Sequence, residues 1–421
     1  MNSASERRSY LPATLVAMAA VYLMLACIPA YADNPDSWGP EGYWSTRGNQ
    51  IIDSTGRPVR LTGVNWYGFE TTTFVVHGLW AQDYKYILNA IKANGYNVIR
   101  IPFSNQMVES DPVPNSISFS NSSGPINTDL QGLTALQVLD KIVSYAGSIG
   151  LHIILDNHRS EAGNSAEASG LWYTDAYPEA AWLNDWITLT TRYKRSSAVI
   201  GMDLRNEPHN AYAGGSCWTG DTNSNIDVPG CPLSDTAHNW PGAAQRAGDI
   251  VLGINPSLLV FVEGVDEYDN DYYWNGGNLE GVASNPVVLG QRNKLVYSAH
   301  DYGPNLYQQP WFNSSTTPAA LDALWDKHWG YIYNDEIAPV WVGEFGTDNT
   351  PSDIVSTTPG SQGQWFSSLV AYIGRHKWMN WTYWALNGED EYALLDSNYD
   401  ATPVSPIKQA LLAGIEFHFW Y

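Results

Sequence analysis

The feature of this sequence that most constrains its fold is an alternation of two patterns. Eight short apolar runs, rich in β-branched residues and typical of strands buried on both faces, recur along it. They lie near residues 61–66, 97–101, 151–156, 199–205, 258–263, 295–300, 340–344 and 380–384. Segments with helical spacing lie between them, as at 84–91, 136–143 and 407–412, and the sixth helical region is the least regular.

Strand-then-helix units repeated in this way predict an α/β fold, a (β/α)8 TIM barrel whose helices cover a closed parallel sheet. A short N-terminal hairpin is expected at 50–59. A length of 421 residues would allow two or three domains, but one barrel of this size is ordinary. No repeat, linker or break in composition marks a second domain.

The first residues are expected to be removed. Arg7 and Arg8 precede an apolar run that ends in Ala30-Tyr31-Ala32, which places small residues where a signal peptidase reads. We therefore predict a signal peptide over 1–32, export from the cytoplasm, and a single catalytic barrel domain over 33–421. The paired arginines also weakly resemble a twin-arginine signal, so the export route stays open.

The three cysteines fit an exported protein. Cys27 follows Leu25-Ala26, a loose resemblance to a lipoprotein attachment site, and would otherwise be lost with the leader. Cys217 and Cys231 then form an even pair, which predicts a disulfide in an oxidising compartment. A loop of about 15 residues would gain roughly 3 kcal/mol from this bond in the chain-entropy model.

The charge balance excludes several partners. The chain has 21 Lys and Arg against 43 Asp and Glu, a formal net charge of −22. Such a chain lacks the basic stripe that neutralises a phosphate backbone, so nucleic acid and anionic membrane surfaces are unlikely partners. A monomer is the default expectation. The 19 Trp and 26 Tyr, by contrast, need an explanation.

Polar residues follow six of the apolar runs. The carboxyl ends of barrel strands converge on one mouth, where barrel active sites are built. The sequence therefore predicts one polar site that contains several carboxylates. Its members are expected to be Arg100, Asp156-Asn157-His158, Asn206-Glu207, His300-Asp301-Tyr302, Glu344 and Trp384.

Glu207 and Glu344 would face each other from the fourth and seventh strands. Cleavage of a glycosidic bond needs a proton on the leaving oxygen and a nucleophile or water at the anomeric carbon. Carboxyl groups about 5–5.5 Å apart imply retention, and about 6.5–9.5 Å implies inversion. The sequence leaves this distance open. Either glutamate alone could be an ordinary ion-paired residue, but six polar strand ends together favour a site.

The motifs around these residues resemble glycoside hydrolase family 5 (cellulase family A), specifically its bacterial endoglucanase branch of retaining β-1,4-glucanases on a (β/α)8 barrel. The resemblance runs from residue 42 to about residue 408. Its motifs are GVNWYGFET at 63–71, HGLW at 77–80, VIRIP at 98–102, DNHR at 156–159, LRNEPH at 204–209, YSAHDY at 297–302, VGEFG at 342–346 and WTYW at 381–384.

Carried over by position, the resemblance implies that Glu207 is the general acid/base and Glu344 the nucleophile. Arg100 would hold Glu344 ionised, because a nearby positive charge favours the carboxylate. Asn206 would bind the 2-hydroxyl of the sugar.

The same resemblance gives His158, His300 and Tyr302 the task of orienting the nucleophile and the sugar at the cleavage site. Trp384 would form the floor under that sugar, since flat apolar faces leave water together. The mechanism requires no cofactor, and the sequence has no phosphate-binding glycine loop and no zinc signature.

Other candidates have an ordinary packing role as the alternative. Trp80 and Trp274 are expected to line further sugar subsites, whereas for Trp172 core packing is the stronger interpretation. The acidic run at 266–271 could bind calcium, but it lacks the glycine and final glutamate of a calcium loop, so a solvated loop is expected. His152 is expected to be a barrel residue rather than a ligand.

The sequence thus predicts a secreted, retaining endo-β-1,4-glucanase that acts on cellulose or a soluble β-glucan. A related β-mannanase, xyloglucanase or mixed-linkage glucanase would use the same two glutamates and stays open. A carbohydrate-binding protein with an inactive site is more remote, because a pure binder has no use for a paired acid and nucleophile.

Overall fold

The computed structural model describes residues 43–211, 214–223 and 226–418. The predicted signal peptide and the boundary between residues 32 and 33 lie outside these ranges. Within them, every helix is too short or too polar to cross a lipid bilayer.

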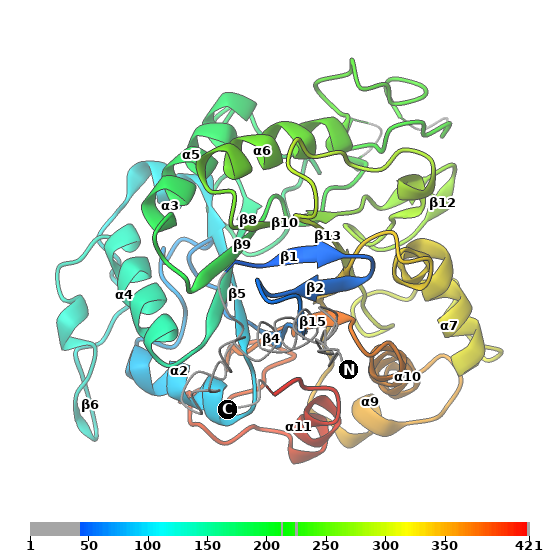
Figure 1. Cartoon of the computed structure of the whole chain (residues 1–421). Helices are drawn as coiled ribbons and strands as arrows, with labels where there is room; N and C mark the ends of the chain where they lie inside the picture. The colour runs from blue at the N-terminus through cyan, green and yellow to red at the C-terminus, as the bar shows by residue number, and fades with distance from the viewer. Residues whose placement is uncertain (1–42, 212–213, 224–225, 419–421) are drawn as a thin grey trace, which may run out of the picture. The chain divides into compact units, whose positions relative to one another are not determined.

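Eight parallel strands form a closed barrel in the order β10-β13-β14-β15-β4-β5-β8-β9 (Figure 1). Each of the eight predicted runs is one of these strands, so the predicted barrel is confirmed. The strands are β4 (Thr62–Asn65), β5 (Val98–Ser104), β8 (His152–Arg159), β9 (Val199–Asp203), β10 (Leu259–Glu263), β13 (Leu295–His300), β14 (Val340–Glu344) and β15 (Asn380–Tyr383).

Helices connect most of the strands and cover the outside of the barrel (Figure 1). The α-helices are α2 (Tyr84–Ala93), α3 (Asn105–Ser110), α4 (Ala135–Ser148), α5 (Glu179–Tyr193), α6 (Trp240–Ile254), α7 (Pro318–Trp325), α8 (Tyr331–Asn334), α9 (Pro351–Val355), α10 (Gln362–Arg375) and α11 (Pro406–Ala413). Two 3₁₀ turns, η1 (Thr128–Leu130) and η3 (Glu280–Ala283), and a π-helical turn, η4 (Asp326–Gly330), complete the helical elements of the described residues.

The expectation of a helix after every strand is wrong at one place. Between β10 and β13 the chain forms a two-stranded hairpin, β11 (Glu267–Tyr268) with β12 (Asp271–Tyr272), and then only η3. The least regular predicted helical segment is α7, which continues through η4 into α8. A second small hairpin pairs β6 (Ser120–Asn121) with β7 (Gly124–Pro125).

Local sequence signals set several helix starts. The side chain of Asp83 accepts the backbone N–H of Lys85 in α2, and Ser361 accepts that of Gln364 in α10. Short polar side chains at this position satisfy N–H groups that have no partner within the helix. These caps fix where each helix begins and so where the preceding strand-end loop stops.

The barrel interior changes character along its axis. At the amino-terminal end, inward residues of the strands form an apolar cluster that includes Val98, Ile154 and Phe261. Two positions further along the same strands, the inward residues become Arg100, Asp156 and Glu263. A strand points successive side chains to opposite faces, so every second residue points into the barrel. These inward residues form the apolar cluster at one end of the barrel and the polar mouth at the other.

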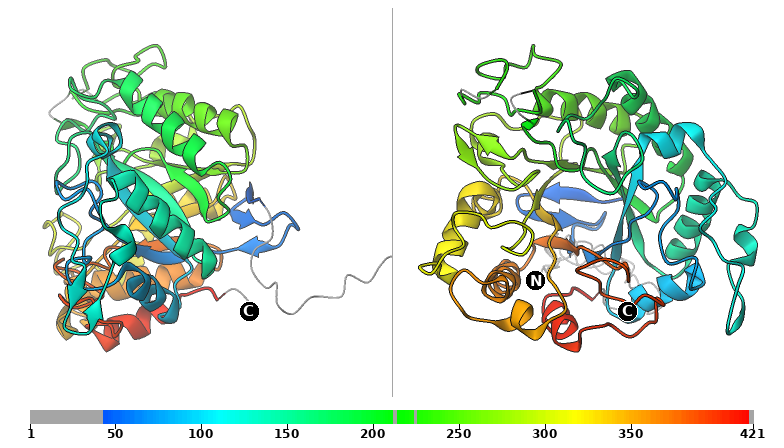
Figure 2. Two further views of the ribbon diagram at one scale, coloured as in Figure 1. Left: turned by 90° about the vertical axis from the view of Figure 1, so that its left-hand side faces the viewer. Right: turned by 180° about the vertical axis from the view of Figure 1, so that it is seen from behind.

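A small antiparallel sheet packs on the apolar end. It consists of β1 (Ser45–Arg47), β2 (Gln50–Ile52) and β3 (Pro58–Val59), and it includes the predicted hairpin plus one strand that the sequence did not indicate. Trp44, Ile51 and Val59 from this segment join the cluster of inward strand residues. Figure 2 shows these blue strands at one end of the barrel, which leaves the other mouth for the polar residues.

Candidate active site

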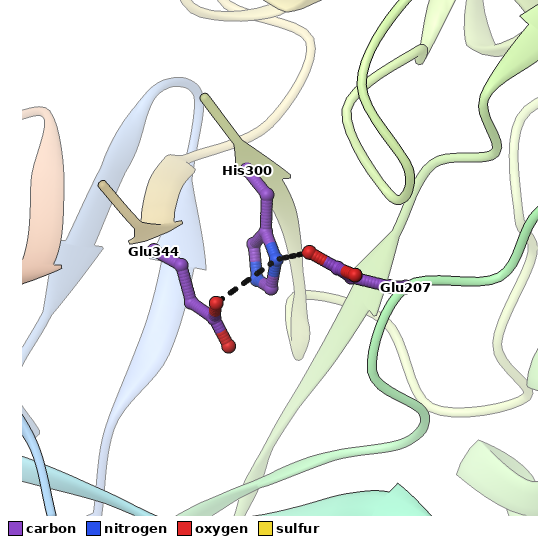
Figure 3. A group of neighbouring side chains, drawn as sticks. All are labelled: Glu207, His300 and Glu344. Carbon is purple, nitrogen blue, oxygen red and sulfur yellow. Dashed lines mark hydrogen bonds and ion pairs between the residues drawn. The ribbon is translucent and has the colours of Figure 1, made fainter. Parts of the chain in front are cut away.

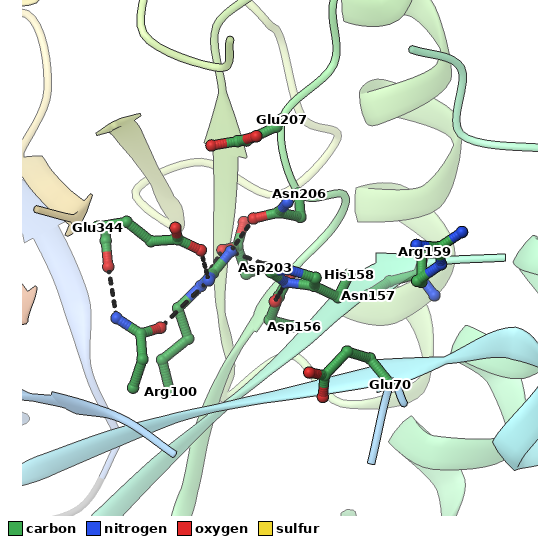
Figure 4. Close-up of polar contacts among 12 residues, drawn as sticks. Glu70, Arg100, Asp156, Asn157, His158, Arg159, Asp203, Asn206, Glu207 and Glu344 are labelled. Atoms are coloured by element: carbon green, nitrogen blue, oxygen red, sulfur yellow. Dashed lines mark hydrogen bonds and ion pairs between the residues drawn. The ribbon is translucent and has the colours of Figure 1, made fainter. Parts of the chain in front are cut away.

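The predicted strand-end residues gather at the carboxyl ends of the barrel strands. Figure 4 shows Arg100 at the centre of this group, beneath Asn206 and Glu207 and beside Glu344. The structure brings nine of the predicted site residues into one connected set of contacts. These are Arg100, Asp156, His158, Asn206, Glu207, His300, Tyr302, Glu344 and Trp384.

Glu344 is buried and accepts hydrogen bonds on both carboxylate oxygens. Arg100 Nη1 lies 2.5 Å from Oε1, and the Tyr302 hydroxyl lies 2.8 Å from Oε2. Burial alone would raise the pKa of Glu344, but the positive charges of His300, Arg100 and His158 hold this pKa below the usual range. Glu344 is therefore ionised near neutral pH, as a nucleophile must be.

A register shift in the sheet turns Glu344 toward the mouth. Ala299 pairs with Val342 but His300 pairs with Glu344, so β14 carries one extra residue at this point. Bulges of this kind redirect a side chain and recur next to active sites. The extra residue, Gly343, lies so close to the His300 ring and the Ser298 hydroxyl that a larger side chain would crowd them.

Glu207 follows β9 and lies across the mouth from Glu344. Its side chain is 19% exposed, and its Oε1 lies 3.1 Å from His300 Nδ1. His300 stands between the two glutamates, with the same nitrogen 3.7 Å from Glu344 Oε2 (Figure 3). One carboxylate oxygen of Glu207 and one of Glu344 lie within 4.8 Å of each other.

Arg100 is fully buried and each of its nitrogens has a partner. Nε donates to Asp203 at 2.9 Å, Nη1 to Asn65 and Glu344, and Nη2 to Asn206 at 3.0 Å. Because the Asn206 Oδ1 accepts this bond, the NH₂ group of Asn206 remains available as a donor. Further contacts reach Asp156 and Glu263, each at 3.1 Å. One guanidinium thus orients side chains from several strands.

Carboxylates outnumber the cations around Arg100. The structure groups Asp156, Asp203 and Glu263 closely enough to hold a metal ion, but Arg100 contacts all three. Burial raises the pKa of Asp203 well above its usual value, so this carboxyl takes up a proton readily. Arg100 thus supplies a positive charge to all three carboxylates.

Two aromatic stacks flank the site. His158 donates toward Asp156 at 2.7 Å and stacks on Trp384, with ring centroids 5.6 Å apart. Burial would lower the pKa of His158, but the charge of Asp156 raises it. Trp384 also stacks on Tyr67 at 5.3 Å. Contacts then continue from Tyr67 to His77 and from His77 to Trp80, so Trp80 belongs to one row of rings with Trp384.

Glu207 also lines a cavity of about 480 Å³. Trp274 lies in its wall, next to the ring of Tyr302 at a centroid distance of 6.3 Å. The lining combines further aromatic and apolar side chains with amides, namely Tyr272, Leu306 and Tyr307 with Asn275, Gln308 and Gln309. Such a surface suits the face of a sugar ring.

The remaining candidates have structural roles. Trp172 is fully buried and packs against Trp182 and Trp240, as the packing interpretation predicts. Cys217 and Cys231 form the predicted disulfide. His152 packs edge-on against Trp44 at the opposite end of the barrel.

The acidic run at 266–271 differs from the solvated loop that the sequence suggested. Asp266 is buried and accepts the backbone N–H of Asn210 at 2.7 Å. Asp271 pairs with Lys327 and with His328, so its charge is neutralised by side chains of η4. Spacing alone did not reveal these partners because they come from distant segments.

Three buried residues that contact Arg100 were missed from the sequence, namely Asn65, Asp203 and Glu263. Glu263 ends β10 and contacts Arg100, His300 and the backbone of Glu207. Its position at the end of the fifth apolar run is the signal that could have identified it, because the other strand ends were selected by the same criterion.

Comparisons with known proteins find similar chains over most of this sequence. The model of the cellulase family (glycosyl hydrolase family 5) matches residues 52–390. An endoglucanase of Paenibacillus polymyxa is 43% identical over 90% of this chain and 88% of its own length. The major extracellular endoglucanase of Xanthomonas campestris is 34% identical over 93% of this chain and 73% of its own. The structure of a Pyrococcus horikoshii endocellulase complex with cellotetraose has a TM-score of 0.76 and 33% identity, and the match covers 90% of this chain and 100% of that one.

Proposed function

The chain belongs to the cellulase family, glycosyl hydrolase family 5, and from this membership we propose that it cleaves internal β-1,4-glucosidic bonds with retention of configuration. It is an endo-β-1,4-glucanase. Its substrate is a β-1,4-linked glucan, either cellulose or a soluble β-glucan.

The observation that carries the stereochemical part of this proposal is the distance between the two glutamates. Oxygens of Glu207 and Glu344 lie within 4.8 Å of each other. Retaining glycosidases place their two carboxyl groups about 5–5.5 Å apart, because the nucleophile must reach the anomeric carbon directly. A water molecule held between the groups, as inversion requires, would need about 6.5–9.5 Å.

In the first step, an ionised Glu344 oxygen forms a bond to the anomeric carbon while the glycosidic C–O bond breaks. Glu207 gives its proton to the leaving oxygen, which departs as a sugar hydroxyl. The available NH₂ group of Asn206 binds the 2-hydroxyl of the reacting sugar. Arg100 and Tyr302 keep Glu344 ionised until it reacts.

In the second step, Glu207 is a carboxylate and takes a proton from water. The resulting hydroxide equivalent attacks the anomeric carbon, the bond to Glu344 breaks, and both glutamates return to their starting states. His300 contacts the carboxyl groups of both Glu207 and Glu344. It therefore stays close to the negative charge, which passes from one glutamate to the other during the cycle.

Binding along the glucan uses the aromatic surfaces on either side of the glutamates. Trp384 and the row of rings that ends at Trp80 would bind sugars on the non-reducing side. Trp274 and its neighbouring tyrosines would bind the leaving-group side. Apolar sugar faces stacked on these rings account for part of the high Trp and Tyr content.

We also propose that the protein is secreted as a monomer after removal of residues 1–32. The Cys217–Cys231 disulfide supports an oxidising destination. The extracellular location named for the Xanthomonas campestris relative supports the same destination.

The test is a product profile of the purified protein on carboxymethyl cellulose, mixed-linkage glucan, xyloglucan and mannan, with Glu344→Ala as the control. Rapid shortening of β-1,4-glucan that is lost in the variant supports the proposal. Cleavage of mannan or xyloglucan alone would change the substrate but keep the two glutamates. The absence of any cleavage would favour a binding protein.

A further inference from the structure

Glu263 is a fully buried carboxyl group directly beneath the proposed acid/base. Its Oε2 accepts the backbone N–H of Glu207 at 2.7 Å. Its Oε1 accepts from Arg100 Nη2 at 3.1 Å and lies 3.2 Å from His300 Nε2. Three different elements of the site therefore meet on one carboxyl group.

Two of the three neighbours donate hydrogen bonds to Glu263, and His300 Nε2 makes an ion-pair contact with it. A backbone amide and a guanidinium can only donate, so both oxygens of Glu263 act as acceptors. Burial raises the pKa of Glu263, but hydrogen bonds donated to both of its oxygens favour the ionised form. An ionised Glu263 in turn favours a protonated His300 at 3.2 Å.

This arrangement fixes the protonation of His300. Burial would lower the pKa of His300, but the charges of Glu263 and Glu344 raise it well above its usual value. An imidazolium carries a proton on both nitrogens, so Nε2–H lies beside Glu263 Oε1 with an N···O distance of 3.2 Å, and Nδ1–H faces Glu207 Oε1 at 3.1 Å. Because Glu207 Oε1 accepts the hydrogen bond from His300, the proton that Glu207 donates as the acid is favoured on Oε2.

The backbone contact positions the acid/base in a second way. Glu207 has a φ of 49°, in the left-handed region that a residue with a side chain rarely adopts. Its N–H is held by Glu263 in this conformation. Gly276 packs over both residues, and a Cβ there would lie 2.3 Å from Glu263 Oε2. Glycine at position 276 therefore leaves space for the Glu263 carboxylate.

We propose that Glu263 is a positioning residue for the acid step, which it serves by holding the Glu207 backbone and by orienting His300 so that the acid proton resides on the Glu207 oxygen facing the leaving group. This inference rests on the proposed function. Glu263 touches neither glutamate's reacting oxygen and acts only through Glu207 and His300.

A pair of substrates with different leaving groups tests this role. Cellotetraose has a poor leaving group that needs a proton. The dinitrophenolate of an activated dinitrophenyl β-cellobioside, by contrast, leaves without one. Glu263→Gln keeps the shape of the side chain, but the NH₂ group of the glutamine would face the N–H donors of Glu207 and Arg100. For this variant we expect kcat/KM on cellotetraose to fall about 100-fold, and on the aryl substrate by less than about fivefold.

Asp185→Asn is the matched control, because Asp185 is another buried carboxyl, bonded to Asn105 at 2.7 Å and outside the site's contacts. It should change kcat/KM on both substrates by the same factor. An equal loss on both substrates for Glu263→Gln, or no loss on either, would overturn the inference.

Glu263→Asp keeps the charge but withdraws it from the Glu207 N–H, and it provides the test if the Gln variant does not fold. The same unequal loss, smaller in size, is expected, and equal losses would again refute the role. Inactivity of the unmodified protein on both substrates would instead contradict the proposed function, so the two failures are distinguishable.

Discussion

Among single residues, Tyr302 offers a direct check on the charge of Glu344. Its hydroxyl donates to Oε2 at 2.8 Å and helps hold the pKa of Glu344 below the usual range. A lowered pKa keeps the proposed nucleophile, Glu344, ionised down to more acidic pH, and activity that depends on it should persist there. Removal of the hydroxyl raises this pKa and moves the loss of activity toward neutral pH.

We therefore expect Tyr302→Phe to shift the acidic limb of the kcat/KM profile upward by about one pH unit, the equivalent of about 1.4 kcal/mol. The measurement is kcat/KM on a soluble β-glucan from acid to neutral pH. An acidic limb at the same pH as in the unmodified protein would show that Tyr302 does not influence Glu344.

At the same scale, the sequence predicted the site well where a polar residue ends a strand. Arg100, Glu207 and Glu344 could be placed at one mouth because parallel strands end at the same side of a barrel. The partners of each residue could not be predicted, since these contacts depend on register. The bulge beside Glu344 and the left-handed backbone of Glu207 have no signal in a single sequence.

Among the elements, α11 is tied to the strand-end loops by one buried lysine. Lys408 Nζ has four oxygen acceptors at 2.9–3.1 Å, the Tyr383 hydroxyl and the carbonyls of Thr347, Tyr392 and Ala393. Without the Lys408 ammonium group, these buried carbonyls would lose a hydrogen-bond donor and would still be shielded from water, which costs free energy.

Lys408→Met is accordingly expected to lower the free energy of unfolding by about 3 kcal/mol or more. Denaturant titration monitored by tryptophan fluorescence measures the change. Lys377→Met, which replaces a lysine that lies over the Trp378 ring, is the matched control and should have a smaller effect. Equal stability of the Lys408 variant and the unmodified protein would contradict this account.

The disulfide stabilises the long connection between β9 and α6. Cys217 and Cys231 are 14 positions apart, and for a loop of this length the chain-entropy model gives about 3 kcal/mol. The double variant Cys217→Ser, Cys231→Ser should unfold at lower urea concentration than the oxidised protein. Reduction of the unmodified protein should reproduce the effect, and an unchanged midpoint would mean that the loop is held by other contacts.

Elements were predictable where their pattern is periodic. The eight barrel strands and helices such as α2 and α4 follow from apolar spacing. The segment between β10 and β13 was not predictable as a 3₁₀ turn and a hairpin. Its irregular backbone is stabilised by distant side chains, such as Lys327 and His328 against Asp271.

For the whole molecule, the excess of acidic residues has a consequence for stability. A net charge of −22 at pH 7 opposes the compact state through self-repulsion. Salt shortens the screening length from about 30 Å at 0.01 M to about 8 Å at 0.15 M. We expect this increase in salt to raise the Tm at pH 7 but not near the isoelectric point of about 4.6. Equal salt effects at the two pH values would refute this explanation.

The central claim is that Glu344 and Glu207 cleave β-1,4-glucan by double displacement, and its most direct test is the anomeric configuration of the first product. Proton NMR spectra recorded during rapid cleavage of cellopentaose should show the β-anomer at the newly formed reducing end, before mutarotation mixes the two forms. Accumulation of the α-anomer first would establish inversion and contradict the assignment of Glu344 as a nucleophile.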